Sequence, residues 1–291
     1  MNLERKNPIT ILCYLFFVIF ITIFSTNPIM LGISFVSSIL FYFALKGWKK
    51  TLIRLAYSLL FVAIITLVNP LFSRQGMTAL FEIGSLIVTE ESILYGVAIG
   101  VMFSSSMIWF GAMNILLDSD KISYIFGKYT PKIGTILSVS LGLFPKYIAQ
   151  YKKIDNNLKA LGLYNQASLW RKIKLKMHTL STLISWSIEG ALTLSDSMSA
   201  RGYDLKHKRV FGKYHFGVSD IILLIISIAV GVVILVFMGL GVGSYYFYPT
   251  FKPLQWDVDV WIYFATFCFM NLMLAVDLWE MIKWQFSISK I

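Results

Sequence analysis

The sequence predicts an all-α, polytopic membrane protein with about six or seven transmembrane helices and long helices on the cytoplasmic side. Of its 291 residues, 57% are hydrophobic and only 14% are charged, and the mean hydropathy is +0.71. A soluble domain carries about a quarter charged residues, so this chain has too little polar surface to cover a globule in water. Two further observations support the fold class, namely a series of long apolar runs and an uneven distribution of lysine and arginine.

The apolar runs supply the membrane helices, because a helix needs about 20 apolar residues to cross the hydrocarbon core. Candidate spans are residues 9–24, 30–45, 52–72, 93–117, 218–240 and 260–282. The first two are short and are separated by Asn27-Pro28, so a tight hairpin is an alternative to two full crossings. Residues 133–148 are apolar enough for a seventh span or for a helix buried against the bundle. We therefore divide the chain into N-terminal membrane helices (1–132), a cytoplasmic or interfacial region (133–217) and a C-terminal membrane helix pair (218–291).

Lysine and arginine residues predict the orientation. With the N-terminus inside, 24 of the 26 basic residues are cytoplasmic: 2 before the first span, 4 in the first inner loop, 16 from Lys121 to Lys213 and 2 at the C-terminus. Only Arg74 and Lys252 fall outside. Cytoplasmic loops of membrane proteins carry such an excess, so both termini are predicted to be cytoplasmic. The net charge of +11 follows from this topology, and a nucleic-acid partner is not needed to explain it.

The inner segment 146–213 contains 13 basic residues and is too long for a simple connector. Between residues 180 and 198, apolar side chains recur at three- and four-residue steps, which indicates a helix. Small residues lie among them and permit close approach of another helix; we single out Ser181, Ser185, Gly190 and Ser195. This helix either lies against the bundle alone or also receives a second protein on its other face. Residues 169–176, with Trp170 beside alternating basic residues, suit the lipid headgroup level or a solvated turn.

The sequence lacks recognisable motifs for nucleotide binding or metal binding. The chain has no Gly-x4-Gly-Lys-Ser/Thr phosphate loop, and His178, His207 and His215 lack the spacing of a metal site. Asp277 and Glu280 are near the inner end of the last span, where we expect them to pair with Lys283 or meet water. We therefore expect no cofactor, no metal and no enzymatic activity in this chain.

Four segments, in order, resemble the T component of energy-coupling factor (ECF) transporters, the EcfT and CbiQ-like family. The stretch Asn69-Pro70-Leu71-Phe72-Ser73-Arg74-Gln75-Gly76 is similar to a segment that follows an early span of that family. The stretch Thr89-Glu90-Glu91-Ser92-Ile93-Leu94-Tyr95-Gly96 resembles the entry into the next span. Leu143-Phe144-Pro145 is placed like the Phe/Ile-Pro that precedes the long cytoplasmic helices, and Ala200-Arg201-Gly202 matches the motif that ends a coupling helix.

The resemblance implies a function and a set of partners. Two ATP-binding cassette ATPase subunits bind the ends of two long coupling helices, each through an x-Arg-x motif. A small membrane protein, the S component, binds the vitamin or metal ion and packs on the coupling helices. ATP-driven motion of the ATPases then releases the cargo inside a bacterial or archaeal cell. For this chain, Ser181, Ser185, Gly190 and Ser195 are the candidates for packing on the S component.

The sequence departs from the family at the first docking motif. Ala160-Leu161-Gly162 has leucine where arginine is usual, whereas the second motif keeps Arg201. Arginine presents a planar fork of donors that lysine does not reproduce, so neighbouring Lys159 is a weaker substitute. We therefore expect unequal contacts with the two ATPases. The alternative function is a stand-alone ion-coupled secondary transporter, for which Asp277 and Glu280 are the nearest candidate coupling residues.

Overall fold

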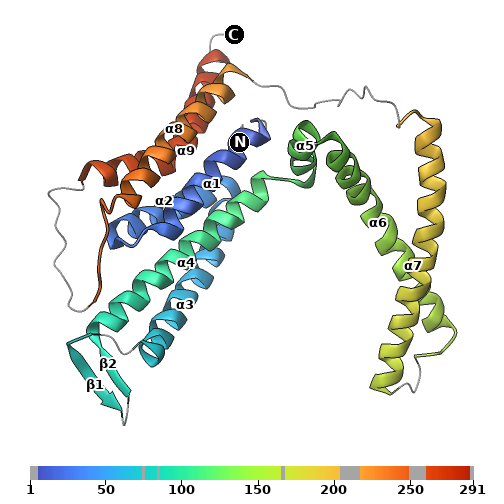
Figure 1. Cartoon of the computed structure of the whole chain (residues 1–291), viewed down its shortest axis with the longest axis horizontal. Helices are drawn as coiled ribbons and strands as arrows, with labels where there is room; N and C mark the ends of the chain where they lie inside the picture. The colour runs from blue at the N-terminus through green and yellow to red at the C-terminus, as the bar shows by residue number, and fades with distance from the viewer. Residues whose placement is uncertain are drawn as a thin grey trace. The chain divides into compact units, whose positions relative to one another are not determined.

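The computed structural model describes residues 6–73, 76–83, 86–164, 168–203, 217–248 and 260–288. The elements are α1 (Pro8–Phe24), α2 (Pro28–Lys46), α3 (Trp48–Phe72), β1 (Ala79–Ile83), β2 (Leu86–Thr89), α4 (Glu90–Leu116), α5 (Ser119–Tyr129), α6 (Pro131–Ala160), α7 (Leu169–Ala200), α8 (Val218–Gly239) and α9 (Val260–Ile288) (Figure 1). They form two compact units, Met1–Asp118 with Tyr214–Ile291, and Ser119–Lys213. The prediction of an all-α membrane protein is confirmed.

Helices α2, α3, α4, α8 and α9 are long and apolar enough to cross a membrane, and α1 is a shorter apolar helix of 17 residues. Asn7 and Asn27 cap α1 and α2 by accepting hydrogen bonds from the backbone amides two residues on, each followed by a proline at the first helical position. The second cap, at Asn27, ends the first apolar stretch as one helix and begins another, so two separate helices are confirmed. Residues 133–148 do not form a span of their own, because they belong to α6, which continues to Ala160.

Close packing of α3 on α4 depends on small residues in α4. A Cβ atom added at Gly96 would lie 3.1 Å from the Thr66 Cα atom, and one at Gly100 would lie 3.1 Å from the Val62 Cα atom. One turn further along α4, the Ser104 hydroxyl donates to the Ser58 carbonyl at 3.0 Å. Small residues at four-residue steps allow two membrane helices to approach this closely.

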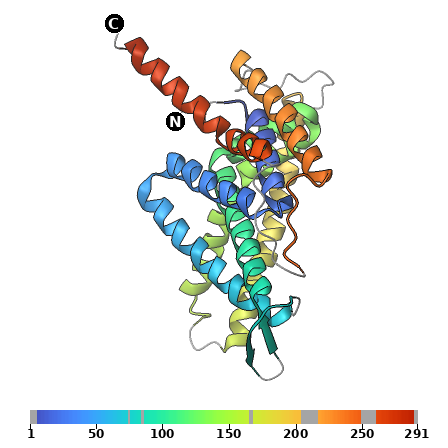
Figure 2. The ribbon, with the colours of Figure 1, turned by 90° about the vertical axis from the view of Figure 1, so that its left-hand side faces the viewer.

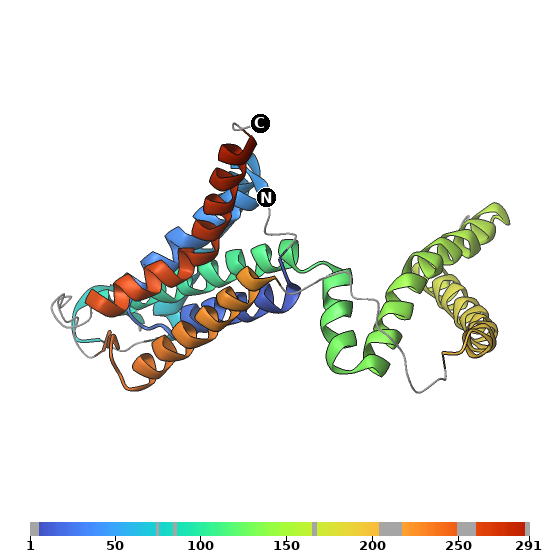
Figure 3. The same ribbon diagram turned by 90° about the horizontal axis from the view of Figure 1, so that it is seen from above.

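Aromatic side chains fill the centre of the first unit. Trp109 of α4 is fully buried, stacks near Phe41 of α2 with ring centroids 5.2 Å apart, and donates its indole N–H to Ser34 at 3.2 Å. Tyr14 of α1 is buried and donates to the Met270 carbonyl of α9 at 2.6 Å. Each buried ring therefore has a partner for its polar atom, as an apolar interior requires. Helix α1 also packs along α8 (Figure 3).

A small antiparallel β-hairpin, β1 and β2, joins α3 to α4 and extends beyond their ends (Figure 2). Arg74, in this connection, was predicted to lie outside, and these strands were not predicted. Glu91, in the first turn of α4, is buried and accepts a hydrogen bond from the Thr78 hydroxyl at 2.7 Å. This contact ties the start of the hairpin to α4.

The second unit contains α5, α6 and α7. Helices α6 and α7 are 30 and 32 residues long and pack side by side, with the Tyr147 ring of α6 5.9 Å from that of Trp186 in α7. Helix α6 runs through Pro145, whereas the family resemblance placed this proline before the long helices. A proline inside a helix removes one backbone hydrogen bond and leaves the Leu141 carbonyl without its usual donor. The family motif is therefore internal to the first long helix here.

Candidate functional site

The first candidate docking tip is the C-terminal end of α6. The helix ends at Ala160, Leu161 occupies the cap position, and Gly162 follows with a φ of +70°. The Gly162 amide donates to the Lys159 carbonyl at 2.9 Å, and the Leu163 amide donates to the Leu158 carbonyl at 3.3 Å. A reverse hydrogen bond across six residues, closed by glycine in the left-handed region, is a Schellman motif.

The second tip, at the end of α7, has the same backbone. Arg201 occupies the cap position, Gly202 has a φ of +78°, and its amide donates to the Ser199 carbonyl at 3.0 Å. The Tyr203 amide then donates to the Met198 carbonyl at 3.1 Å. The structure therefore gives Leu161 and Arg201 equivalent positions, each just before the glycine that ends its helix.

The side chains at the two caps, Leu161 and Arg201, are both exposed but differ in chemistry. Leu161 is 72% exposed, although a leucine on a water-facing surface gains nothing from that position. Arg201 is also exposed, and among the described residues its guanidinium has neither an ion pair nor a hydrogen bond. One tip thus offers an apolar group, and the other offers a charged fork of five donors.

Lys159 is not a replacement for the missing arginine. Its ammonium forms an ion pair with Asp155 one turn earlier, at 2.6 Å, and the Tyr164 hydroxyl donates to the same carboxylate at 2.8 Å. The Lys159 ammonium and the Tyr164 hydroxyl together hold the pKa of the Asp155 carboxyl below its ordinary value. The same hydrogen bond raises the pKa of the Tyr164 hydroxyl. Lys159 is therefore engaged within its own helix, and Leu161 is the side chain that projects from the first tip.

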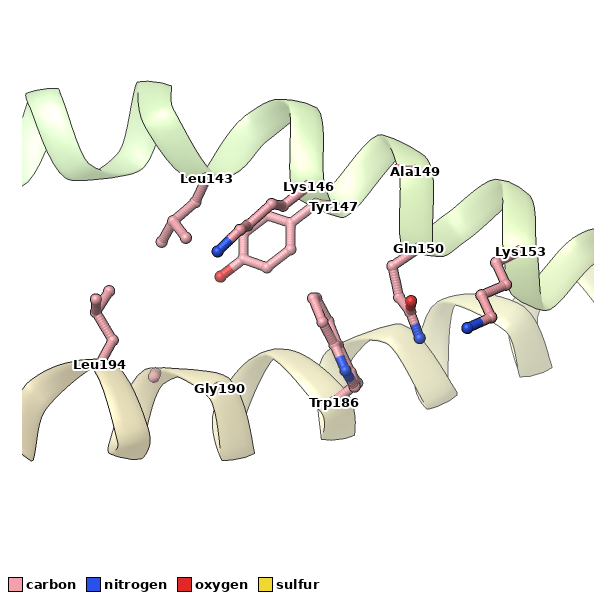
Figure 4. Close-up of a pocket in the computed structure, with 10 residues that line it drawn as sticks. Leu143, Lys146, Tyr147, Ala149, Gln150, Lys153, Trp186, Gly190 and Leu194 are labelled. Atoms are coloured by element: carbon pink, nitrogen blue, oxygen red, sulfur yellow. The ribbon is translucent and has the colours of Figure 1, made fainter. Parts of the chain in front are cut away.

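The tips lie at opposite ends of the α6–α7 pair. The two helices are antiparallel, because Leu143, early in the contact on α6, lies across from Leu194, late in the contact on α7 (Figure 4). A helix of 32 residues, such as α7, is about 48 Å long. The first tip is next to the start of α7 and the second is at its end, so one small binding pocket does not accommodate both.

An exposed apolar stripe runs along α7. Its members recur at three- and four-residue steps and are each at least 41% exposed. They are Ile173, Met177, Leu180, Ile184, Ile188 and Leu192. Ser181, Ser185 and Ser195 lie within the same face at about 100° per residue, and all three are exposed. The helical period predicted from the sequence is thus present, and its apolar side is open.

Gly190 does not belong to this stripe. It is nine residues, about two and a half turns, from Ser181 and faces α6, where it lines a groove with Tyr147 and Trp186. The predicted set of four small residues is therefore divided between two sides of α7. Several hydroxyls on α7 bond back to its own carbonyls, as Ser185 does to Ser181 at 3.2 Å and Thr182 does to His178 at 3.0 Å. Because these hydroxyls already donate within their own helix, a partner helix can pack on them without leaving a buried hydrogen-bond donor unsatisfied.

Residues 169–176 form the first turns of α7, so the alternative of a solvated turn is wrong. Leu169 and Trp170 are 77% and 82% exposed at this end of the helix. His207, His215, Arg74 and Lys252, which entered the sequence analysis, lie outside the described residues.

The two family-like segments in the first unit meet where α3 ends and α4 begins. The Asn69 amide donates to the Ser92 carbonyl at 2.7 Å, and the Ser92 hydroxyl donates to the Ser73 carbonyl at 3.0 Å. Gly76 has a φ of +139°, and a Cβ atom there would lie 2.6 Å from a Glu91 carboxylate oxygen. These segments therefore share one role, which is to close the α3–α4 connection.

Sequence reasoning missed a charge cluster at the opposite end of this unit. Lys6 is 7% exposed, forms an ion pair with Glu280 near the end of α9, and lies 3.8 Å from Asp220 at the start of α8. Glu280 therefore pairs with Lys6 rather than with Lys283. Because the partners are more than 200 residues apart in the chain, no local pattern indicated the contact.

Comparison with known proteins supports the family resemblance. The family described as "Cobalt transport protein" (CbiQ) matches residues 2–210. The chain is 24% identical over 191 residues to "Energy-coupling factor transporter transmembrane protein EcfT 1" of Listeria monocytogenes serotype 1/2a (strain 08-5578), covering 62% of this chain and 72% of that protein. It is also 24% identical over 215 residues to "Energy-coupling factor transporter transmembrane protein EcfT" of Streptococcus equi subsp. equi (strain 4047), covering 68% and 77%. The chain is thus a multi-pass membrane protein that belongs to the CbiQ family of cobalt transport proteins.

Proposed function

We propose that this chain is the T component of an ATP-driven ECF-type uptake transporter, which couples the motion of two ATPase subunits to a substrate-binding S component. The observation that carries the proposal is the pair of equivalent Schellman tips at opposite ends of α6 and α7, one of which presents Arg201 without a partner among the described residues. Two separated protrusions suit two partner subunits. The similarity to EcfT proteins supports ATPase subunits as the partners.

Arg201 is proposed to dock in one ATPase through charge-assisted, bidentate hydrogen bonds to a carboxylate or to backbone carbonyls. Leu161 is proposed to dock in the other ATPase through apolar contact. Because each side chain lies at the cap of a long rigid helix, displacement of a docked tip moves the whole helix. Helices α6 and α7 are therefore the coupling helices that transmit the motion.

The exposed stripe on α7, with Ser181, Ser185 and Ser195, is the proposed surface for the S component. Small side chains permit a partner helix to approach, and the apolar side chains contribute burial. Substrate choice, whether vitamin or metal ion, then belongs to the S component.

The proposed orientation places both ends of the described chain on the cytoplasmic side. Lys6 at the start of α1 and Glu280 near the end of α9 are in contact, so the two ends lie at the same side of the first unit. Helices α2 and α4 run in the same direction, since Leu31 clusters with Ala98 and Phe41 packs against Trp109. This direction brings the basic segment from Lys46 to Arg54 to the side where α4 ends, in agreement with the excess of positive charge inside.

The test is co-purification in mild detergent of the full-length chain with ATPase subunits and a small membrane protein, together with ATP-dependent uptake. Arg201→Glu is expected to remove one ATPase and abolish uptake, because it places a carboxylate where a cation is recognised. The matched control is Lys152→Glu, an equal charge change on an exposed residue inside α6, away from both tips. An intact complex and unchanged uptake with Arg201→Glu would refute the docking role.

The alternative of an ion-coupled transporter gives a different result in a simpler experiment. The purified chain alone, in vesicles without ATP, would then take up substrate along an ion gradient. Glu280, one of its two candidate coupling residues, is already paired with Lys6. Under our proposal the chain alone transports nothing.

A further inference from the structure

A groove between α6 and α7 combines basic and apolar side chains. Its volume is about 380 Å³, and it lies within the second unit. Leu143 and Leu194 face each other at one end, and Tyr147 and Trp186 approach each other in the middle (Figure 4). The groove lining also includes Gly190, Lys146, Gln150 and Lys153 from the two helices.

The two lysines point toward the same groove without a counter-charge. Lys146 and Lys153 are seven residues apart on α6, which is about two turns or 10 Å, so they share one face. Gln150 lies between them. Among the described residues neither lysine has an ion pair or hydrogen bond, and no carboxylate lines the groove. Two uncompensated ammonium groups on either side of an amide donor form a site for an anionic oxygen group.

We propose that this groove binds an anionic phospholipid. The phosphate would be held by Lys146 and Lys153, with Gln150 as a further donor, and the first part of an acyl chain would lie against Leu143 and Leu194. Tyr147 and Trp186 lie between the leucine pair and Gln150, with Lys146 beside Tyr147 (Figure 4). Amphipathic aromatic rings favour the region where lipid headgroups meet acyl chains.

The apolar end of the groove decides between the possible anions. A free phosphate or a soluble acidic peptide would use the lysines and leave the leucine pair without a partner. A phospholipid uses both ends at once. In the chain, helix α6 follows α4, a membrane span, after the short helix α5. This proposal does not depend on docking to an ATPase.

The experiment uses the purified full-length chain without partners, and native mass spectrometry to measure retention of phosphatidylglycerol and of phosphatidylcholine. We expect selective retention of phosphatidylglycerol. The double variant Lys146→Gln/Lys153→Gln should weaken it roughly thirtyfold, since each lysine near an anionic headgroup contributes about fivefold. The matched control, Lys172→Gln/Lys176→Gln, removes two charges from the start of α7, outside the groove. Equal loss in both variants would mean general charge attraction and would overturn the proposal.

A second variant fills the groove and leaves the charge unchanged. A Cβ atom at Gly190 meets nothing within 4 Å, and leucine favours a helix more than glycine does, so Gly190→Leu should fold. It should abolish selective retention of phosphatidylglycerol. Unchanged retention would overturn the proposal, as would full competition by inorganic phosphate, which would identify a soluble anion as the ligand.

Discussion

The ends of α6 and α7 have the same backbone and opposite chemistry. Both helices stop in a Schellman motif with glycine in the left-handed region, and the cap residue is leucine at one end and arginine at the other. The glycine and the preceding helix thus determine where each tip projects, while one side chain determines what each tip recognises. Position and recognition are encoded separately, so either is open to change by mutation without the other.

The largest effect is expected from truncating the arginine. Arg201→Ala should weaken co-purification of its ATPase by about thirtyfold or more, because removing one partner of a buried charge pair costs about 2–5 kcal/mol. Leu161→Ala removes three carbon groups from a contact that is only partly buried, so it should weaken the other contact by about tenfold, or about 1.4 kcal/mol. Quantitative pull-down of each ATPase measures both effects. Equal losses from the two variants would contradict unequal docking.

Tighter binding to the first ATPase is expected when the first tip is given the arginine of the second. Leu161→Arg places an arginine on a backbone equivalent to that of Arg201, in the position where the family pattern has one. If the first ATPase groove retains acceptors for arginine, binding should tighten by about tenfold or more, the value of one hydrogen bond to a charged group. If that groove is adapted to leucine, binding should fall, because an arginine would be buried without a partner. An unchanged affinity would show that the first tip does not contact the ATPase.

Sequence patterns predicted the membrane helices well, because length and apolarity alone specify a span. The helical period in α7 was equally visible, and the tips could be located because glycine marks a helix end. The hairpin could not be predicted from its own residues, since its attachment depends on Glu91 and Gly76 meeting across the connection. The contact of Lys6 with Glu280 could not be predicted for the same reason, because the two residues are far apart in the sequence and meet only in the folded chain.

Assignment of residues to a face was less successful than assignment to a helix. Ser181, Ser185 and Ser195 share the open side of α7, but Gly190, nine residues from Ser181, lies on the opposite side and faces α6. Lys159 appeared to be a substitute for arginine until Asp155 and Tyr164 were placed beside it. The spacing in the sequence already separated Gly190 from Ser181, whereas for Lys159 the missing information was a side-chain neighbour that the linear sequence leaves unspecified.

Substituting the glycines tests whether the two backbones are truly equivalent. Gly162→Ala and Gly202→Ala should each cost about 1 kcal/mol locally, because a side chain disfavours the left-handed region. Amide hydrogen exchange at Leu163 and Tyr203 should accelerate by a similar factor of about five. The control is Gly142→Ala inside α6, where space is open and φ is not in the left-handed region, so the tips should not change. A response at one tip alone would show that the motifs differ in strength.

The smallest effect is expected from Asp155, and it should be confined to the first tip. Asp155→Asn removes the ion pair with Lys159 and weakens the bond from Tyr164, so exchange at Leu163 should increase modestly. Tyr203 should be unaffected, because Ser195 occupies the position equivalent to Asp155 at the second tip.

Acid should have the same effect as the Asp155→Asn variant. The pKa of the Asp155 carboxyl is lowered in the folded state, so its stabilising contribution is fully present above the unfolded pKa of about 3.9 and is lost as pH falls through the folded value. Site-specific NMR of a labelled Tyr164 ring, titrated below pH 5, should therefore detect release of the first tip in the wild type. The Asp155→Asn variant should show no such transition. A transition that persists in the variant would assign the acid sensitivity to another group.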